Sequence, residues 1–313
     1  MLILVTGATG FIGGALVRRL VNHGKRVRCA LRRPVAVRGA ETVVVGEIGS
    51  QTQWQEAMSG VNVVVHLAGV AHLPATPHSA GVYRAVNAGG TNSLVQAAAA
   101  AGVKRLVFVS SIGVNGETSG ERPFREEDAA NPEGPYAVSK FEAEQRLVEL
   151  AAAQAIEWCI IRPPMVYGPN AQGNFRQLLR LIAGGWPLPL GAATAKRSYI
   201  ALDNLVSVLL RTVDDPAAGN TLFLASDDED ISTVDFIRCL GKHMRTKVRL
   251  VPVPPILVKA AAGVAGRSLQ ASRLFAPLQI DASRLRSRLA WKPEVTLEEG
   301  MRRVAETSNH RSD

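Results

Sequence analysis

The chain has 313 residues, of which 47% are hydrophobic, so it can bury a large core as one α/β unit or as a large domain with a smaller one. The formal net charge is +9, but the basic residues are scattered apart from Arg32-Arg33 and a cluster at Arg284, Arg286 and Arg288. No nucleic-acid-binding motif accompanies them, so we expect a small anionic ligand and no nucleic-acid partner.

The first residues predict a buried strand that runs into a glycine-rich turn and a helix. Leu2–Thr6 is apolar or β-branched, Gly7, Gly10 and Gly13 recur every third residue, and an amphipathic helix extends to Gly24. Such a turn presents unpaired N–H groups at a helix N-terminus, where they can bind a pyrophosphate. We expect a dinucleotide site here, with a tight turn at Gly7, phosphates close to Gly10 and helix–strand packing at Gly13.

Strands and helices then alternate over the first half of the chain. Further strands are predicted at Val27–Leu31, Val43–Val45, Val61–Leu67, Arg105–Val109 and Glu157–Ile161. Long helices are predicted at Tyr83–Ala101 and Tyr136–Ala155. This alternation predicts a Rossmann-type, doubly wound parallel sheet over residues 1–168, with its ligand beyond the carboxyl ends of the strands.

Residues 169–313 predict mainly a smaller substrate-binding lobe, with later segments returning to the first domain. The segments become shorter and richer in proline, with helices near Phe175–Ala183, Leu202–Val213 and Val234–His243. Pro254–Gly266 is apolar but shorter than the roughly 18 residues that a membrane span needs, and it predicts a packed helix.

The remaining composition favours a cytoplasmic protein without a membrane partner. Met1 leads straight into a strand with no signal-peptide pattern. Three widely separated cysteines have no metal-binding spacing and argue against a disulfide scaffold, so no metal site is expected. Cys29 and Cys159 lie in strand-like runs and are expected to be buried, inert thiols.

The candidate catalytic residues are Ser111, Tyr136 and Lys140. Tyr136 and Lys140 are four residues apart and therefore share one face of a helix. A nearby ammonium favours the phenolate form of tyrosine, which would give a proton donor and acceptor usable near neutral pH. Ser111 ends the fifth predicted strand and could hydrogen-bond a substrate oxygen at the same point; Ser110 is the weaker candidate of the pair.

These motifs together resemble the extended short-chain dehydrogenase/reductase family, in its nucleotide-sugar epimerase/dehydratase branch. The resemblance extends to about Ala305 and is strongest for the subgroup similar to UDP-glucose 4-epimerase, which also contains 4-ketoreductases. The motifs that carry it are Thr6–Gly13, His66–Gly69, Asn87–Thr91, Ser110-Ser111, Tyr136–Lys140 and Arg162–Pro169.

The resemblance implies a role for each matching residue. Tyr136 would be the acid/base, Ser111 would polarise the same sugar oxygen, and Lys140 would lower the pKa of Tyr136 and bind the nicotinamide ribose. The residues implied at an NAD or NADP cofactor are Gly7, Thr9, Gly10, Phe11, Ile12, Gly13, Arg32, Glu47, Ile48, Leu67, Ala68, Gly69, Asn87, Lys140 and Pro163. Those implied at a UDP-sugar substrate are His72, Ser111, Asn174, Leu188, Gly191 and Arg197.

Two departures from the family pattern leave the reaction open. The second strand ends in Leu31-Arg32-Arg33 without the carboxylate that usually binds the ribose of NAD, so NADP is possible. Met165 replaces an asparagine that many epimerases carry. The leading hypothesis is a 4-epimerase of a UDP-hexose or UDP-N-acetylhexosamine. The alternatives are an NAD(P)H-dependent reductase of a UDP-4-keto-6-deoxy-N-acetylhexosamine and, more remotely, a non-catalytic dinucleotide sensor.

The family also suggests a homodimer through the two long helices.

Overall fold

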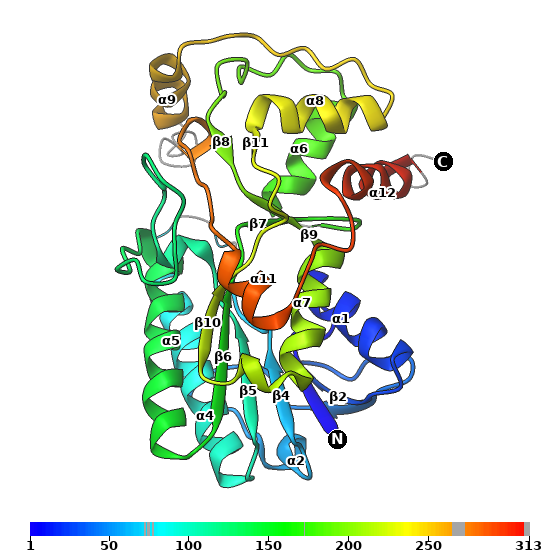
Figure 1. Ribbon diagram of the computed structural model, residues 1–313, viewed down its shortest axis with the longest axis vertical. Helices are drawn as coiled ribbons and strands as arrows, with labels where there is room; N and C mark the ends of the chain where they lie inside the picture. Colours follow the sequence, from blue (N-terminus) through cyan, green and yellow to red (C-terminus); the bar gives the residue numbers. More distant parts are fainter. Residues whose placement is uncertain (72, 74–75, 77, 172, 265–272, 310–313) are drawn as a thin grey trace.

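A seven-stranded, fully parallel sheet organises the molecule, which is described here from a computed structural model (Figure 1). The strand order is β10-β6-β5-β4-β1-β2-β3. The strands are β1 (Leu2–Thr6), β2 (Arg26–Leu31), β3 (Glu41–Val44), β4 (Val63–His66), β5 (Arg105–Val109), β6 (Glu157–Arg162) and β10 (Thr221–Leu224). The structure describes all residues except 72, 74–75, 77, 172, 265–272 and 310–313.

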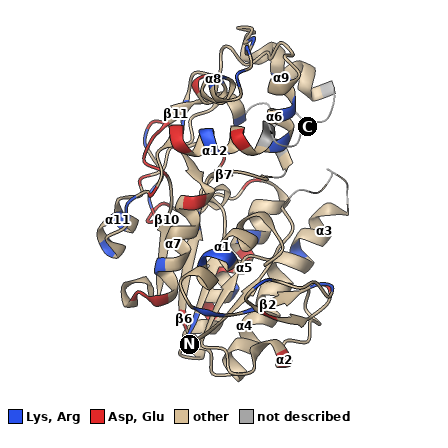
Figure 2. Ribbon diagram, turned by 90° about the vertical axis from the view of Figure 1, so that its right-hand side faces the viewer, with Lys and Arg blue, Asp and Glu red and all other residues tan. Residues whose placement is uncertain are grey.

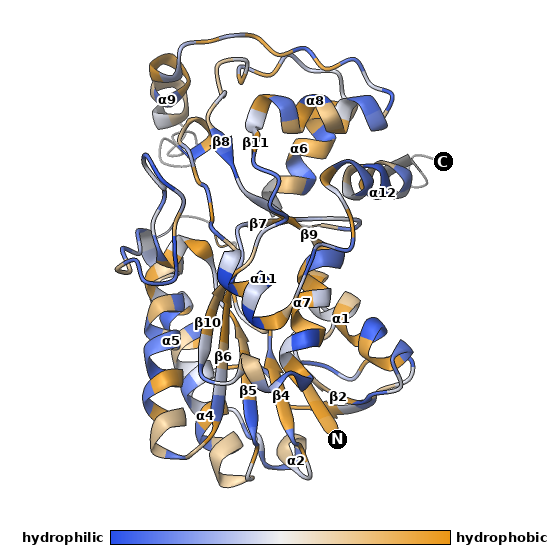
Figure 3. Cartoon of the chain, in the orientation of Figure 1, coloured by the Kyte–Doolittle hydropathy of each residue, from blue (hydrophilic) through white to orange (hydrophobic). Residues whose placement is uncertain are grey.

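Helices cover both faces of this sheet, so the predicted doubly wound parallel fold is confirmed. One face buries apolar side chains of α1 (Phe11–Asn22), α7 (Leu202–Asp214) and α11 (Ser283–Leu289). The other face packs against α2 (Gln55–Met58), α4 (Gly90–Ala100) and α5 (Gly134–Ala153). The central strands are orange in Figure 3 because both of their faces are buried, as parallel strands require.

The sheet contains one strand more than the sequence predicts. β10 pairs with β6 from Thr221↔Cys159 to Leu224↔Arg162, and it is followed in the chain by residues that lie far from the sheet. The helices α7 and α11 also come from beyond residue 168 and pack on the sheet. The N-terminal and C-terminal halves of the chain therefore build this core together.

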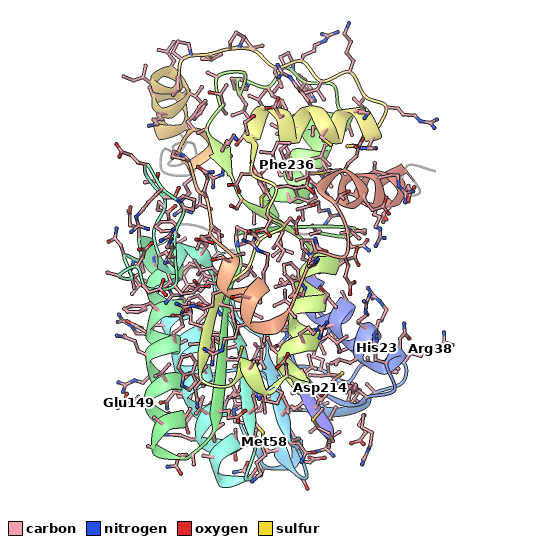
Figure 4. All side chains as sticks on the ribbon, viewed as in Figure 1. His23, Arg38, Met58, Glu149, Asp214 and Phe236 are labelled. Atoms are coloured by element: carbon pink, nitrogen blue, oxygen red, sulfur yellow. The ribbon has the colours of Figure 1, made fainter. Side chains whose placement is uncertain are left out.

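A second hydrophobic cluster lies beyond the carboxyl ends of the strands. It is formed around Phe236, labelled in Figure 4, whose ring stacks on Tyr199 at 4.2 Å between centroids. Its elements are β7 (Met165–Tyr167), α6 (Gly173–Ala183), β8 (Lys196–Arg197), β9 (Tyr199–Ala201), β11 (Ile231–Ser232), α8 (Thr233–His243) and α12 (Leu297–Asn309). The remaining elements are α3 (Ser79–Tyr83), the π-helix η1 (Arg84–Gly89), the 3-10 helices η2 (Ile112–Val114) and η3 (Pro216–Ala218), and α9 (Pro255–Val264).

A segment at residues 277–281, called the strap, connects the second hydrophobic cluster, called the upper cluster, to the part of the molecule around the central sheet. On one side, Ser198 donates its backbone N–H to Leu278 O at 2.8 Å. On the other side, Phe124 donates to Gln279 O at 2.8 Å, and Asp281 donates to Phe124 O at 2.9 Å. The strap thus bonds to both the upper cluster and the loop that precedes α5.

Two sequence expectations need correction. The helix predicted over Tyr83–Ala101 is α3, η1 and α4 in succession, because a π-helical segment widens the turn around Asn87. The apolar stretch after Pro254 does form α9, but the prediction that this helix is packed is wrong. Ile256 is 74% exposed and Leu257 is 58% exposed.

Two other expectations can be tested directly. Cys29 and Cys159 are fully buried, as predicted, and burial raises the pKa of their thiols to about 11 and about 12. Among the residues that the structure describes, no helix combines the length and apolar character that crossing a bilayer requires.

Candidate active site at the carboxyl ends of the strands

The glycine turn after β1 is held by backbone contacts that leave no room for side chains. Gly7 has φ +68°, and a Cβ placed there would lie 2.8 Å from Ala68 N. A Cβ on Gly13 would lie 2.1 Å from Gly7 O, because α1 packs directly on the turn. The roles predicted for Gly7 in the turn and Gly13 in packing follow from this geometry.

The first turn of α1 can hold an anion. Gly10 donates its N–H to Gly7 O at 2.9 Å and caps the helix without a side-chain hydrogen bond. The N–H groups that begin a helix have no partners inside it and lie at the positive end of the helix dipole. Gly10 and Thr9 are exposed, and Phe11 and Ile12 are half-buried. The turn thus offers N–H donors of the kind that a pyrophosphate needs, and binding at these residues stays a prediction.

A buried polar network beneath the turn was not foreseen from the sequence. Leu67 and Ala68 donate their N–H groups to Thr6 Oγ1 at 3.2 and 3.1 Å, and Thr6 Oγ1 lies 2.7 Å from His66 Nδ1. On its other side, His66 Nε2 lies 3.1 Å from Thr91 Oγ1, which donates to the backbone oxygen of residue 87. This arrangement assigns the proton of His66 to Nε2.

The same network keeps His66 uncharged. Burial, together with the charge of Lys140, lowers the pKa of His66 to about 3. Its ring stacks on Phe108 with centroids 5.6 Å apart. His66 therefore fixes the end of β4 against the turn as a neutral hydrogen-bonding group.

Asn87 braces the loop that follows β4. Its amide exchanges hydrogen bonds with Val70, accepting from Val70 N at 2.9 Å and donating to Val70 O at 3.0 Å. It also donates to Ser139 Oγ on α5 at 2.9 Å. Asn87 is 2% exposed, so it ties this loop to α5; its predicted role at the cofactor stays a prediction.

Ser111 and Tyr136 meet where β5 ends and α5 begins. Ser111 Oγ caps η2 by accepting from Gly113 N at 3.2 Å, and it lies close enough to the Tyr136 hydroxyl to lower the pKa of that phenol. The hydroxyl of Ser110 is instead buried and has no hydrogen-bond partner in the described part of the chain. The geometry therefore favours Ser111 over Ser110, as the sequence does.

The predicted effect of Lys140 on Tyr136 is not what the structure shows. Burial raises the pKa of Tyr136 to about 12, the Ser111 hydrogen bond lowers it in part, and Tyr83 adds to the rise. The ring of Tyr83 meets the Tyr136 ring edge-on at 5.8 Å. The sequence predicted a lowered pKa for this phenol. That prediction is wrong, because the desolvation of the phenol is the largest effect and raises its pKa.

Lys140 is buried one helical turn further along α5. Its Nζ donates to Val109 O at 2.7 Å and lies 3.9 Å from the centroid of the Phe108 ring. Desolvation lowers the pKa of Lys140 to about 7, although Glu144 opposes the shift. An amine held at this pKa can gain or lose a proton near neutral pH.

A buried ion pair lies below Lys140 and was also missed. Arg162 donates to Glu144 Oε1 from Nε at 3.0 Å and to Oε2 from Nη2 at 2.5 Å. Its Nη1 donates to Asn115 Oδ1 at 2.9 Å, just after η2. Two sequence signals were available, since Glu144 is four residues after Lys140 and Arg162 immediately precedes Pro163.

The other predicted cofactor residues surround the same edge of the sheet. Arg32 and Glu47, which follow β2 and β3, form an exposed ion pair at 3.6 Å. Ile48 is half-buried and so close to Gly90 that a Cβ there would lie 2.5 Å from Ile48 Cγ2. Pro163 O accepts from Ile112 N at 2.9 Å.

The predicted substrate residues are only partly brought together. Arg197 is half-buried and donates to the carbonyl oxygens of Arg273 and Ala276. Arg273 itself pairs with Glu117, on the loop before α5. Leu188 and Gly191 donate their backbone N–H groups to the carbonyl oxygens of Arg249 and Val251. His72 and the side chain of Asn174 lie outside the described residues.

The comparisons with known proteins decide the family. The model of the NAD dependent epimerase/dehydratase family matches residues 3–224. The chain belongs to this family. It is therefore an enzyme of the epimerase/dehydratase type, and the resemblance seen in its motifs to extended short-chain dehydrogenases/reductases is confirmed.

Curated relatives match nearly the full length of the chain. A "UDP-glucose 4-epimerase" of Vibrio cholerae is 40% identical over 311 residues, covering 97% of this chain and 94% of the relative. An "N-acetyl-alpha-D-glucosaminyl-diphospho-ditrans,octacis-undecaprenol 4-epimerase" of Escherichia coli O157:H7 is 27% identical, covering 96% of this chain and 93% of the relative.

Solved structures share the fold. The UDP-glucose 4-epimerase of Thermotoga maritima, solved with UDP-glucose, matches with a TM-score of 0.81 at 21% identity, over 100% of each chain. The UDP-glucuronic acid 4-epimerase of Bacillus cereus, solved with UDP-glucuronic acid and NAD, matches with a TM-score of 0.82 at 21% identity, over 99% of this chain and 100% of the other. The Rossmann-type architecture of this family member is therefore shown.

Proposed function

We propose that the protein is a 4-epimerase of a UDP-hexose or UDP-N-acetylhexosamine. The observation that carries this proposal is the approach of Ser111 to the Tyr136 hydroxyl, next to the buried Lys140 and at the same sheet edge as the glycine turn. The 40% identity with the Vibrio cholerae UDP-glucose 4-epimerase supports C4 of a UDP-sugar as the reacting centre.

The chain offers a group for each part of a dinucleotide. The bare N–H groups at the start of α1 would hold the pyrophosphate, and Glu47 and Ile48 would meet the adenine. Lys140 would bind the nicotinamide ribose, and Pro163 would direct its carbonyl to the nicotinamide amide. When bound, NAD supplies the hydride acceptor and donor for the reaction at C4.

Tyr136 and Ser111 handle the proton of the sugar. Tyr136 takes the proton of the C4 hydroxyl as C4 is oxidised and returns it after the 4-keto sugar has turned its other face. Ser111 hydrogen-bonds the same sugar oxygen and lowers the pKa of Tyr136. Lys140, with a pKa of about 7, can gain or lose a proton beside the ribose that it would bind.

We further propose that the substrate enters between the sheet edge and the upper cluster. His72, Asn174, Leu188, Gly191 and Arg197 are the proposed contacts, with Arg197 on the diphosphate. The phosphate oxygens would compete with the carbonyls of Arg273 and Ala276 for the guanidinium of Arg197.

The first test is to denature the purified protein, identify any released nucleotide, and assay UDP-glucose and UDP-N-acetylglucosamine without added cofactor. We expect stoichiometric NAD and formation of the C4 epimers. Tyr136→Phe should abolish turnover and still release NAD. Turnover that survives Tyr136→Phe would contradict the assigned acid/base. A wild-type chain that binds NAD but forms no epimer from either UDP-sugar would favour the non-catalytic sensor.

A second candidate is the NAD(P)H-dependent reduction of a UDP-4-keto-6-deoxy-N-acetylhexosamine. It is favoured by Arg32, which stands at the end of β2 where a carboxylate would select NAD, and whose partner Glu47 is 79% exposed. A 2′-phosphate could replace this exposed carboxylate. An empty site that binds NADPH more tightly than NADH, with no epimer formed, would replace the epimerase proposal by this one.

We also propose a homodimer through α4 and α5 in the cytoplasm. A shallow groove between these helices is lined by Val95, Gln96, Ala99, Ala100, Leu150 and Gln154. A second copy could fill it with its own helices. Ala99→Arg should convert the dimer into a monomer in sedimentation experiments, and a wild-type chain that sediments as a monomer would overturn this part.

A further inference from the structure

One end of the molecule combines exposed apolar side chains with an excess of basic over acidic side chains. The sequence segments 168–202 and 236–276 contain no Asp or Glu at all, and their described residues build much of this end. Their basic residues are Arg176, Arg180, Lys196, Arg197, Arg238, Lys242, Arg245, Lys247, Arg249, Lys259, Arg267 and Arg273. The two segments therefore carry an excess of positive charge, although Arg238, Lys242 and Arg273 form ion pairs with carboxylates outside them.

Apolar side chains are exposed in the same segments. Of the eleven large hydrophobic residues that are exposed in the described chain, six lie here: Leu181, Trp186, Val251, Ile256, Leu257 and Leu274. Trp186 is 67% exposed, which is unusual for an indole ring. Single exposed apolar residues need no explanation, but several of them in a carboxylate-free region do.

Helix α9 is the clearest feature of this region. It contains a single charged residue, Lys259, and it is orange over most of its length in Figure 3. A helix that is apolar on all sides is normally buried in a protein core or in a membrane. Here both Ile256 and Leu257 face outward, and Lys259 is exposed beside them.

The segment before α9 carries basic side chains that are exposed to solvent, like the apolar side chains of α9. Arg245, Lys247 and Arg249 are exposed, whereas the alternate residues Val248 and Leu250 pack against the upper cluster. No carboxylate forms an ion pair with these three basic residues or with Lys259 in the described chain. In the ribbon of Figure 2, acidic positions are coloured on α12, near β11 and α8 and on the lower elements, and α9 contains none.

Backbone hydrogen bonds connect the apolar and basic parts into one surface. Leu188 donates to Arg249 O at 2.8 Å, and Val251 donates to Leu188 O at 2.9 Å. Trp186 thus lies two residues before Leu188, which bonds to Arg249 and Val251. Helix α9 begins four residues after Val251. We call this surface, made by Trp186, residues 245–251 and the start of α9, the apolar–basic tip.

We propose that the apolar–basic tip docks on a membrane surface that carries anionic lipids. Lys and Arg side chains attract anionic headgroups, while Trp, Ile and Leu side chains enter the boundary between headgroups and acyl chains. A second copy of this chain is a poorer occupant, because two such surfaces would repel each other. The helix lies on the bilayer and does not cross it, in agreement with the lack of a spanning helix in the described chain.

The test is flotation of the full chain with vesicles of phosphatidylcholine alone and of phosphatidylcholine with phosphatidylglycerol. We expect at least tenfold more protein on the anionic vesicles, and a loss of this binding at high salt. The paired variants Ile256→Ser with Leu257→Ser, and Lys247→Glu with Arg249→Glu, should each reduce binding at least tenfold.

Matched variants at the opposite end of the molecule serve as controls. They distinguish binding through the tip from binding that depends only on net charge or on exposed apolar side chains. Val35 and Val44 are each 51% exposed there, and Arg38, labelled in Figure 4, and Lys104 are exposed basic residues. Val35→Ser with Val44→Ser, and Arg38→Glu with Lys104→Glu, should leave binding unchanged. Helical content measured by circular dichroism checks that every variant is folded.

The proposal is overturned if the wild-type chain floats with neither kind of vesicle, or equally with both. It is also overturned if the remote variants lose as much binding as the tip variants. Self-association that disappears with Ile256→Ser and Leu257→Ser, without vesicle binding, would assign the tip to a second copy instead. Because binding is measured without turnover, none of these outcomes depends on the proposed epimerase activity.

Discussion

Arg162 binds both carboxylate oxygens of Glu144 in the interior, below the amine of Lys140. The two side chains are 6% and 4% exposed, so neither can exchange its partner for water. The pair connects the end of β6 to the helix that carries Tyr136 and Lys140, and Asn115 extends it to the loop after Ser111. It therefore positions the backbone around the proposed catalytic residues.

Glu144→Gln is expected to lower the free energy of unfolding by about 3 kcal/mol, because it leaves the buried Arg162 without a counter-charge. Urea denaturation measures this change. The control is Glu149→Gln on the outward side of the same helix, labelled in Figure 4, where the pair with Arg146 is exposed. We expect the free energy of unfolding to change by less than about 0.5 kcal/mol there. Equal effects of both variants would show that the buried pair stabilises the fold no more than the exposed pair does.

Lys140→Met is expected to abolish turnover and to stabilise the fold most at low pH. The folded-state pKa of about 7 lies below the ordinary value of 10.5, so the folded protein disfavours the charged amine. Wild-type stability consequently rises as the pH increases from about 7 to about 10. The stability gained by the variant should shrink over that range, by on the order of 4 kcal/mol.

Urea denaturation at pH 6 and pH 10 tests this dependence. Lys104→Met replaces an exposed lysine and serves as the control, with no pH-dependent gain. A gain for Lys140→Met that stays constant between the two pH values would contradict the lowered pKa of Lys140.

Ser111→Ala is expected to lower kcat by about a hundredfold and to shift its pH profile. The hydrogen bond from Ser111 lowers the pKa of Tyr136, so its removal raises that pKa further. A rate that depends on the phenolate should then rise at higher pH than in the wild-type enzyme. Ser110→Ala removes a hydroxyl without a partner in the described chain and should leave the profile in place. Identical profiles for both variants would reject the role of Ser111.

Gly13→Ala is expected to abolish dinucleotide binding, because its methyl group would lie 2.1 Å from the backbone oxygen of Gly7. The neighbouring Gly14→Ala is the control: its methyl group would lie 3.5 Å from Ala8 O, which is ordinary contact. We expect Gly14→Ala to bind NAD normally and to gain about 0.5 kcal/mol in stability from its higher helix propensity. Calorimetric titration with NAD checks both, and binding by Gly13→Ala would contradict the packing of α1 on the turn.

The sequence was sufficient wherever a short pattern determines local structure. The glycine spacing, the alternation of strands and helices, and the pairing of Tyr136 with Lys140 on one helical face all rest on residues close in sequence. They predicted the parallel sheet and the sheet edge at which Ser111 meets Tyr136.

Features that depend on distant residues were missed or misjudged. The partner of Glu144 is 18 residues away, and Thr6 contacts His66 across 60 residues. The pKa of Tyr136 was predicted in the wrong direction because the sequence shows the neighbouring lysine but not the burial of the phenol. Similarly, the apolar composition of α9 suggested packing, and only the fold reveals that nothing in the described chain covers Ile256.

The pairing of β10 with β6 has a consequence for the order of folding during synthesis. The edge of the central sheet is completed only by residues 221–224, and one of its faces is covered by helices from residues 202–214 and 283–289. A nascent chain that ends near residue 168 has therefore made every proposed catalytic residue but still exposes apolar sheet surface. Such a chain should depend on chaperones until translation has passed α11.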